Sequence, residues 1–163
     1  MSELLHPHWR MRYVTAPRPA AQGSPFAPLL AAGDDRASLI VHRGPACFVI
    51  MNAYPYAPGH LMVLPNREVG ELSALTAAER TEMMDLLVRC QEVLRAVMNP
   101  AGFNVGLNVG KVAGAGFPGH LHFHVVPRWE GDHNFMPVTA DTHVLPQALD
   151  ELWEKLAAAF RAA

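Results

Sequence analysis

The sequence predicts an α+β domain, with a five-stranded, mostly antiparallel sheet, one inserted long helix and one C-terminal helix. Three observations lead to this fold class. Short apolar runs bounded by Gly and Pro recur along the chain, as is typical of strands joined by turns. Two longer segments repeat apolar residues at helical spacing. Strands joined by turns, with helices inserted and appended, indicate a mostly antiparallel sheet.

Five short runs account for the predicted strands, which cover residues 38–42, 46–51, 60–65, 103–109 and 119–127. The turn Arg43-Gly44-Pro45 joins the first two strands into a hairpin. Residues 52–59 hold two prolines and a glycine, so they form a loop before the third strand. Residues 110–119 form a glycine-rich loop between the last two strands.

Two segments have the periodicity of a helix. The inserted helix begins at Thr76-Ala77-Ala78-Glu79, which matches a capping box, and it ends at Asn99-Pro100. The C-terminal helix runs from Val144 to Phe160. Apolar residues at helical spacing mark its buried side, namely Leu145, Leu149, Leu152, Trp153, Leu156 and Phe160.

The chain divides into an irregular N-terminal segment at residues 1–37 and a folded domain at residues 38–163. Four prolines between residues 15 and 37 break regular elements there, and Gly33-Asp34-Asp35 has turn composition. A chain of 163 residues suits a single domain overall.

Composition excludes several classes of function. A net charge of −2 argues against a broad nucleic-acid surface, so any anion site has to be built locally. No apolar run approaches the ~18 residues of a membrane span, and the N-terminus lacks the apolar core of a signal peptide. Cys47 and Cys90 each lie in an apolar stretch and are predicted to be reduced core thiols. A cytoplasmic location follows as the default.

Three histidines alternate with apolar residues in the last predicted strand. Because strand side chains alternate between faces, the histidines share one face, about 7 Å apart, and the apolar residues face the core. The histidines are His120, His122 and His124, and the apolar residues are Leu121, Phe123 and Val125. Such a row suits either a metal site or proton transfer and nucleophilic attack, and the spacing alone does not decide between these two.

Three further features bear on this choice. A fourth histidine, His60, opens the third strand after Pro58-Gly59, and Asn52 and Asn108 lie near strand ends. The glycine-rich loop allows backbone amides to crowd an anion, and Lys111 adds a positive charge for a phosphate tail. Each feature alone also fits a simple turn or a flexible connection.

Taken together, these features favour attack on a phosphorus centre. Metal sites built on histidine pairs usually recruit a carboxylate or a cysteine, and the nearest acidic residues after the row, Glu130 and Asp132, lie beyond Pro127. Neutral imidazole is a competent nucleophile, and it leaves readily from phosphorus when an oxygen attacks. The glycine-rich loop is neither a Walker loop nor a dinucleotide fingerprint.

Residues 120–126 match the pattern His-φ-His-φ-His-φ-φ, with φ apolar, and so resemble the histidine triad (HIT) superfamily of nucleotide hydrolases and transferases. Residues 58–63 match the second landmark of that family. Residues 104–116, 127–129 and 131–137 resemble its diadenosine tetraphosphate phosphorylase-like branch. The resemblance covers about residues 38–156, and it extends more weakly to Trp9-Arg10-Met11-Arg12-Tyr13. It implies a HIT-like fold and a homodimer that joins two five-stranded sheets.

The resemblance implies a role for each matching residue. His122 would be the nucleophile that takes up the nucleotidyl group, and His124 would contact its phosphate and support the leaving or entering group. His120 and His60 would orient the neighbouring imidazoles and phosphate oxygens. The substrate-binding positions are Asn52 near the ribose, and Asn108, Ala115, Gly116 and Trp129 on the polyphosphate side, with Lys111 added from its charge.

The implied activity is cleavage of dinucleoside polyphosphates, most notably diadenosine tetraphosphate, through a nucleotidyl-histidine intermediate. Inorganic phosphate as the acceptor gives phosphorolysis, which we expect, and water gives hydrolysis. Alternatives are a hydrolase of nucleoside phosphoramidates or acyl-adenylates, a slow nucleotide-binding regulatory protein, and a metal-binding protein that uses the histidine row.

Two departures from the branch affect cofactor and substrate. Relatives commonly carry a Cys-x-x-Cys pair in the N-terminal segment, which binds structural zinc in some of them, and here residues 23–27 hold no cysteine. A third ligand position is replaced near Arg67-Glu68, so we expect that the structural zinc is lost and that no cofactor is needed. A divalent metal bound with the nucleotide is compatible with this. His133 stands where a small hydroxyl residue is usual, which leaves the acceptor and substrate preference open.

Overall fold

The computed structural model describes residues 23–132 and 149–162. The strands are β1 (Ile40–Arg43), β2 (Cys47–Met51), β3 (Leu61–Pro65), β4 (Gly102–Leu107) and β5 (Phe123–Arg128). The helices are α2 (Phe26–Ala31), α3 (Ala77–Met98) and α5 (Leu149–Ala162), with short 3₁₀ turns η1 (Leu72–Ala74) and η2 (Lys111–Ala113). The predicted start of the last helix at Val144, together with Leu145 and His133, lies outside the described residues.

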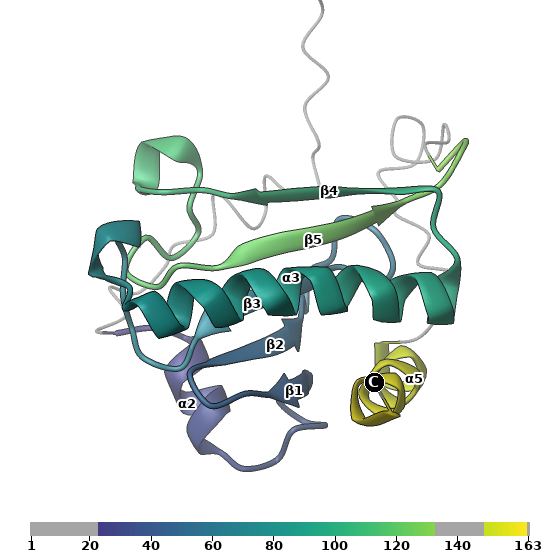
Figure 1. Ribbon diagram of the computed structural model, residues 1–163, viewed down its shortest axis with the longest axis horizontal. Helices are drawn as coiled ribbons and strands as arrows, with labels where there is room; N and C mark the ends of the chain where they lie inside the picture. The colour runs from purple at the N-terminus through teal and green to yellow at the C-terminus, as the bar shows by residue number, and fades with distance from the viewer. Residues whose placement is uncertain (1–22, 133–148, 163) are drawn as a thin grey trace, which may run out of the picture.

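The five strands form one sheet in the order β1-β2-β3-β5-β4 (Figure 1). All four strand pairs are antiparallel, so the predicted α+β fold class is confirmed. The long helix α3 follows β3 and precedes β4 in the chain, as the helical periodicity predicted, and it lies along one face of the sheet (Figure 1). β3, which His60 directly precedes, and β5, which contains His124, are neighbours in the sheet.

The predicted fifth strand at residues 119–127 begins too early, because β5 starts only at Phe123. The ladder between β3 and β5 ends at the pair of Val63 with Phe123. Pro65, the last residue of β3, has no backbone N–H to donate to a longer ladder. Instead of pairing with β3, Leu121 donates its N–H to Val69 O at 2.7 Å. His120 and His122 therefore lie in the segment that leads into the strand.

A short helix, α2, forms inside the segment that was predicted to be irregular. Pro25 is its N-cap residue and Pro28 lies in its first turn. Proline is tolerated there, because the N–H groups of a first turn have no partner within the helix. The prediction of no regular structure before residue 38 is thus wrong for residues 26–31. The division into an N-terminal segment and a domain stays a prediction.

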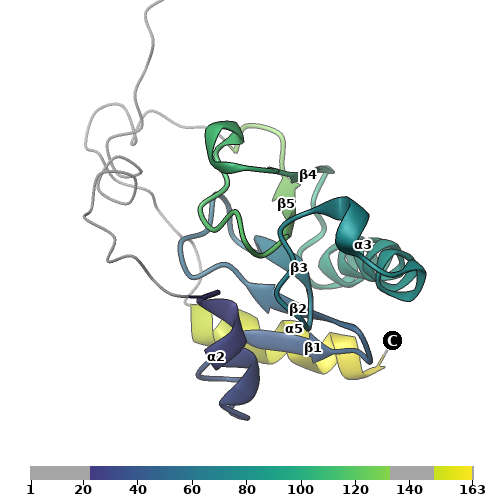
Figure 2. The same ribbon diagram turned by 90° about the vertical axis from the view of Figure 1, so that its left-hand side faces the viewer.

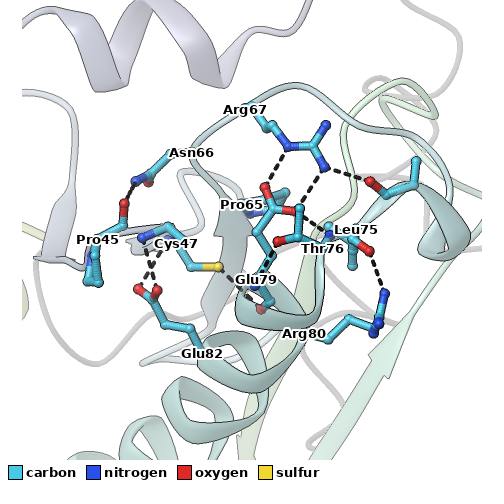
Figure 3. A network of polar contacts seen from close by, with 12 residues as sticks. Pro45, Cys47, Pro65, Asn66, Arg67, Leu75, Thr76, Glu79, Arg80 and Glu82 are labelled. Carbon is cyan, nitrogen blue, oxygen red and sulfur yellow. Dashed lines mark hydrogen bonds and ion pairs between the residues drawn. The ribbon is translucent and has the colours of Figure 1, made fainter.

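The start of α3 is held by a polar network that includes the predicted capping box (Figure 3). Glu79 donates its N–H to Thr76 Oγ1 at 3.2 Å, and Thr76 donates its N–H to Glu79 Oε2 at 2.7 Å. The Arg67 guanidinium donates to both oxygens of the Glu79 carboxylate, at 2.6 and 2.8 Å. These hydrogen bonds lower the pKa of Glu79 to about 2, so its carboxylate stays ionised at neutral pH and keeps the start of the helix in place.

The sheet has an apolar core on each face, with α2 and α3 on opposite sides (Figure 2). The larger core lies under α3 and α5 and includes Cys90, Leu94, Leu121, Val125, Leu156 and Phe160. The smaller core includes Phe26, Ile40, Phe48, Ile50, Met62 and Leu64. Each fully buried aliphatic or aromatic side chain stabilises the fold by about 1.5–3 kcal/mol relative to exposure.

Two other sequence predictions about the core hold. Cys47 and Cys90 are buried and form no disulfide. Leu152, Leu156 and Phe160 are buried on α5, as the apolar spacing of the last helix predicted. Within the described part of the chain, no helix combines the length and apolar character that a membrane crossing requires.

Candidate active site

The four predicted catalytic histidines converge at one end of β3 and β5. His124 lies on β5, His60 directly precedes β3, and His120 and His122 lie just before β5. The ring of His124 lies 5.1 Å from the ring of His60 and 5.1 Å from the ring of His122, between centroids. Leu121, which alternates with these histidines, packs in the larger core, so the predicted division of the two faces is retained.

The hydrogen bonding of His122 determines which of its ring nitrogens carries the lone pair. Its Nδ1 lies 2.8 Å from the carbonyl oxygen of His120. A carbonyl oxygen only accepts, so the proton of a neutral His122 ring is on Nδ1 and the lone pair is on Nε2. Burial lowers the pKa of His122, which is only 6% exposed, and this keeps the ring neutral near pH 7.

His120 uses both ring nitrogens to hold the segment in place. Its Nε2–H donates to Pro65 O at 2.9 Å, and its Nδ1 accepts from the Ser24 hydroxyl at 2.6 Å. Burial lowers the pKa of His120 as well. Its ring also meets Phe26 edge-on, with centroids 5.7 Å apart. His120 therefore anchors the carbonyl group that fixes the tautomer of His122, and its own ring is not placed to attack a substrate.

A chain of hydrogen bonds also fixes the tautomers of His60 and His124. The backbone N–H of Tyr56 donates to His60 Nδ1 at 3.2 Å, so that nitrogen carries no proton in the neutral ring. His60 Nε2 is then the protonated nitrogen and donates to His124 Nδ1 at 2.9 Å. The neutral ring of His124 consequently carries its proton on Nε2, where it can donate to a phosphate oxygen.

Two cavities meet at these histidines. The first has a volume of about 420 Å³, which falls in the range of small-molecule sites. His122 and His124 line it together with Asn52 and Gly116. The remaining wall is largely apolar and includes Phe26, Leu29, Leu39, Ile50, Met62 and Phe117. Such a wall suits the flat apolar faces of a nucleoside base, with its phosphate directed toward the histidines.

The second cavity, of about 370 Å³, lies over β4 and β5 on the other side of His124. Asn108 lines this cavity, and its predicted place on the polyphosphate side stays a prediction. Its wall also includes Tyr56, Asn104 and Arg128, which the sequence reasoning did not select.

Three predicted substrate-binding residues line neither of these cavities. Lys111 is exposed on η2, and Trp129 donates its Nε1–H to Met98 O at 3.3 Å. Ala115 is buried, and its N–H donates to Gly110 O at 3.3 Å instead of pointing at an anion. Their roles in substrate binding stay predictions.

Sequence reasoning missed Tyr56, Ser24 and Phe26 as parts of the site. The Tyr56 ring stacks on His60, with centroids 4.7 Å apart and an angle of 28° between the planes. Its position four residues before His60 was the available signal, because the intervening loop has to bring them together. No local pattern marks Ser24 and Phe26, both of which contact His120 from more than ninety residues earlier in the chain.

The residues at the positions where the resemblance suggests zinc do not fit that metal. The Ser24 hydroxyl is bonded to His120, and the Arg67 guanidinium is paired with the Glu79 carboxylate. Zinc sites in proteins use thiolate, imidazole and carboxylate ligands, which neither of these groups supplies. Across residues 23–132 and 149–162, no three His, Cys, Asp or Glu side chains gather as a metal-binding group.

The lowered pKa values predict a loss of stability and activity on acidification. The pKa of the folded His120, His122 and His42 lies below the ordinary value of about 6.5, in each case chiefly through burial. Between the lowered pKa of the folded protein and the ordinary value of about 6.5, the unfolded chain therefore binds more protons than the folded one. The free energy of unfolding is then highest above pH ~6.5 and falls below it. The lowered pKa of Glu79 contributes stability that is complete above pH ~4.3, the unfolded value, and this contribution is lost only as the pH falls toward about 2.

Urea unfolding and turnover, both measured from pH 8 to pH 5, check this expectation. The free energy of unfolding should be level above pH ~6.5 and should decline toward pH 5. Activity should decline over the same range, since a protonated His122 has no lone pair for attack. A free energy of unfolding that rises on acidification would contradict the assignment of neutral, buried imidazoles.

Comparison with known proteins agrees with this geometry. Residues 35–131 match the family model described as the HIT domain. The AP-4-A phosphorylase of Mycobacterium tuberculosis is 44% identical over 138 residues, which cover 85% of this chain and 70% of that protein. The asymmetrical bis(5'-nucleosyl)-tetraphosphatase of Schizosaccharomyces pombe is 33% identical over 95 residues, 58% of this chain and 52% of that one.

A solved structure shares the fold. The Hit-like protein from Bartonella henselae superposes with a TM-score of 0.67 and 21% identity, covering 87% of this chain and 99% of that one. The family match spans more than half of the chain, and the histidine row lies within it. The chain therefore belongs to the HIT domain family.

Proposed function

We propose that the protein cleaves dinucleoside polyphosphates in two displacements, through a nucleotidyl group held on Nε2 of His122. The observation that carries the proposal is the bond from His122 Nδ1 to His120 O, which puts the lone pair on Nε2 of a neutral, buried ring. This ring lines an apolar cavity beside His124. The names of the M. tuberculosis and S. pombe relatives support this substrate class.

Each displacement follows from these groups. In the first, His122 Nε2 attacks the α-phosphorus, the bond to the leaving polyphosphate breaks, and its electron pair stays on the leaving oxygen. In the second, an acceptor oxygen attacks the same phosphorus and the electron pair of the P–N bond returns to Nε2. The Nε2–H of His124 stabilises negative charge that develops on the phosphoryl oxygens, and it is held ready by His60.

Product analysis tests this function. The protein is incubated with diadenosine tetraphosphate, with and without inorganic phosphate, and the nucleotides are separated. We expect ATP and ADP when phosphate is present, because phosphate as the acceptor converts the bound nucleotidyl group into the diphosphate. ATP and AMP under both conditions would assign water as the acceptor. Intact substrate under both conditions would overturn the proposal, and tight binding without turnover would favour a regulatory protein.

The proposed homodimer is supported by the edges of the sheet. The β1 edge lies against α5, where Trp153 Nε1–H donates to Ile40 O at 2.8 Å. β4 is the other edge strand, and Val105 on it is 44% exposed. An exposed edge of this kind can pair with a second copy of itself. Light scattering should give twice the mass of the chain, and a monomer at micromolar concentration would contradict the proposal.

Two further expectations concern metal content and location. We propose that the protein folds and acts without structural zinc, supported by the bonded Ser24 and Arg67 at the positions in question. Elemental analysis of the purified protein tests this, and one tightly held metal per chain would contradict it.

We also propose a cytoplasmic location, supported by two buried cysteines without a disulfide, which cell fractionation can check.

A further inference from the structure

We propose that Ser24 is a positioning residue for the displacement at His122, and that it acts through the ring and the carbonyl group of His120. This inference rests on the proposed function and extends it to a residue outside the histidine row. Ser24 lines neither of the two cavities. It also precedes residues 35–131, the range that matches the HIT domain, so the family match does not account for it.

The Ser24 hydroxyl has one arrangement that satisfies both of its partners. The backbone N–H of Phe26 donates to Ser24 Oγ at 3.1 Å, and His120 Nδ1 lies 2.6 Å from the same oxygen. Because the Phe26 amide supplies its own hydrogen, the single hydroxyl proton of Ser24 is directed to His120 Nδ1. Ser24 and His120 are only 8% and 1% exposed, so the hydrogen bond between them is shielded from water.

This hydrogen bond stabilises one tautomer of His120. Pro65 O accepts from His120 Nε2–H at 2.9 Å, so in the neutral ring Nδ1 carries the lone pair that the hydroxyl meets. Without the hydroxyl, Nδ1 would lose the donor that the described part of the chain gives it, and an unpaired buried acceptor is costly. The other tautomer would set the lone pair of Nε2 against the carbonyl oxygen of Pro65. Both partners are therefore needed to hold the ring in this position.

The effect reaches His122 through the peptide group between His120 and Leu121. Its carbonyl oxygen accepts from His122 Nδ1–H at 2.8 Å, which leaves the lone pair of His122 on Nε2. Its N–H, from Leu121, donates to Val69 O at 2.7 Å. This bond holds one end of the peptide group, and the His120 ring holds the other. A ring released from Ser24 would let the peptide group tilt, and with it the carbonyl that fixes the tautomer of His122.

The same hydroxyl also places the ring of Phe26 against the histidines. Phe26 is the first residue of α2, which lies on one face of the sheet (Figure 2). Its ring centroid is 5.7 Å from that of His120 and 5.7 Å from that of His122. Because the Phe26 N–H is bonded to Ser24 Oγ, loss of the hydroxyl loosens this packing as well.

The test compares Ser24→Ala with Thr76→Ala. Each substitution removes a hydroxyl group that accepts from a backbone N–H, and Thr76 lies at the start of α3 and lines neither cavity. Both variants are assayed with diadenosine tetraphosphate for kcat and KM, and thermal melts compare their stability. Long-range proton–nitrogen NMR at pH ~8, where the imidazoles are neutral, reports which nitrogen of each ring carries the proton.

We expect Ser24→Ala to lower kcat about tenfold and to keep KM within about twofold of wild type, because Ser24 acts on the nucleophile and lies outside both cavities. In the wild-type protein, His120 should carry its proton on Nε2 and His122 on Nδ1. In Ser24→Ala, the His122 signals should move toward a mixture of the two tautomers. Thr76→Ala should lose stability and keep the wild-type kcat and tautomers.

Three results would overturn the proposal: wild-type kcat in Ser24→Ala, an equal loss of kcat in Thr76→Ala, or a lowered kcat with an unchanged His122 tautomer. If Ser24→Ala does not fold, the wild-type spectrum decides, since a proton on Nδ1 of His120 contradicts the proposal and a proton on Nε2 supports it. Wild-type protein that leaves the nucleotide intact would refute the proposed function instead. The tautomers would still be measurable in that case, so the two failures are distinguishable.

Discussion

Replacing His122 with alanine is expected to reduce cleavage of diadenosine tetraphosphate by a factor on the order of 10³ or more. Among the histidines in residues 23–132, the substitution removes the one whose hydrogen bonding puts a lone pair on Nε2 next to the apolar cavity. The bond from His122 Nδ1 to His120 O is lost as well, so a modest loss of stability accompanies the loss of activity. Steady-state turnover and a thermal melt of the same preparation measure both effects.

His42→Ala is a suitable control for this experiment. His42 is also a partly buried histidine with a lowered pKa, but it stacks on Phe160 of α5, with centroids 5.5 Å apart, and lines neither cavity. This variant should lose some stability and keep its turnover. Turnover in His122→Ala that matches the control would remove His122 from the mechanism.

Gly59→Ala is expected to lower the free energy of unfolding by about 2–4 kcal/mol. Gly59 has a φ of +77°, which disfavours any residue with a Cβ atom. The added Cβ would also lie 2.6 Å from Met98 Sδ and 3.0 Å from Leu94 Cδ2, at the end of α3. Backbone strain and overpacking therefore add, directly before His60.

Gly33→Ala separates these two causes. Gly33 has a similar φ of +73°, but a Cβ atom there meets nothing within 4 Å. Its loss of stability should be only the backbone part, about 1–2 kcal/mol. Equal destabilisation of the two variants in urea unfolding would show that the contacts with Met98 and Leu94 relax without cost, which would contradict the expected packing.

Elements with a strong local signal were predictable from the sequence. The capping box at Thr76 and Glu79 placed the start of α3, and the alternation around His122 placed the histidines and Leu121 on opposite faces. Both signals depend on contacts within a few residues of the chain. The family resemblance then added roles that spacing alone left open, such as the choice between a metal site and a nucleophile.

Features that depend on contacts between distant residues were not predictable in this way. The late start of β5 depends on Pro65, whose missing N–H ends the ladder more than fifty residues earlier in the chain. The second cavity depends on the pairing of Gly106 with His124, which no local pattern indicates. The placement of Trp129 and Ala115 away from both cavities likewise depends on partners in α3 and in the glycine-rich loop.

The central claim is that Nε2 of His122 becomes covalently nucleotidylated during turnover. Rapid quenching into alkali, without phosphate present, followed by digestion and mass spectrometry, tests it directly, because a P–N bond survives in base and is lost in acid. The account predicts one adenylyl group on the peptide that contains His122, absent from His122→Ala. Turnover at the normal rate with an adduct on another residue, or with none at any time point, would contradict it.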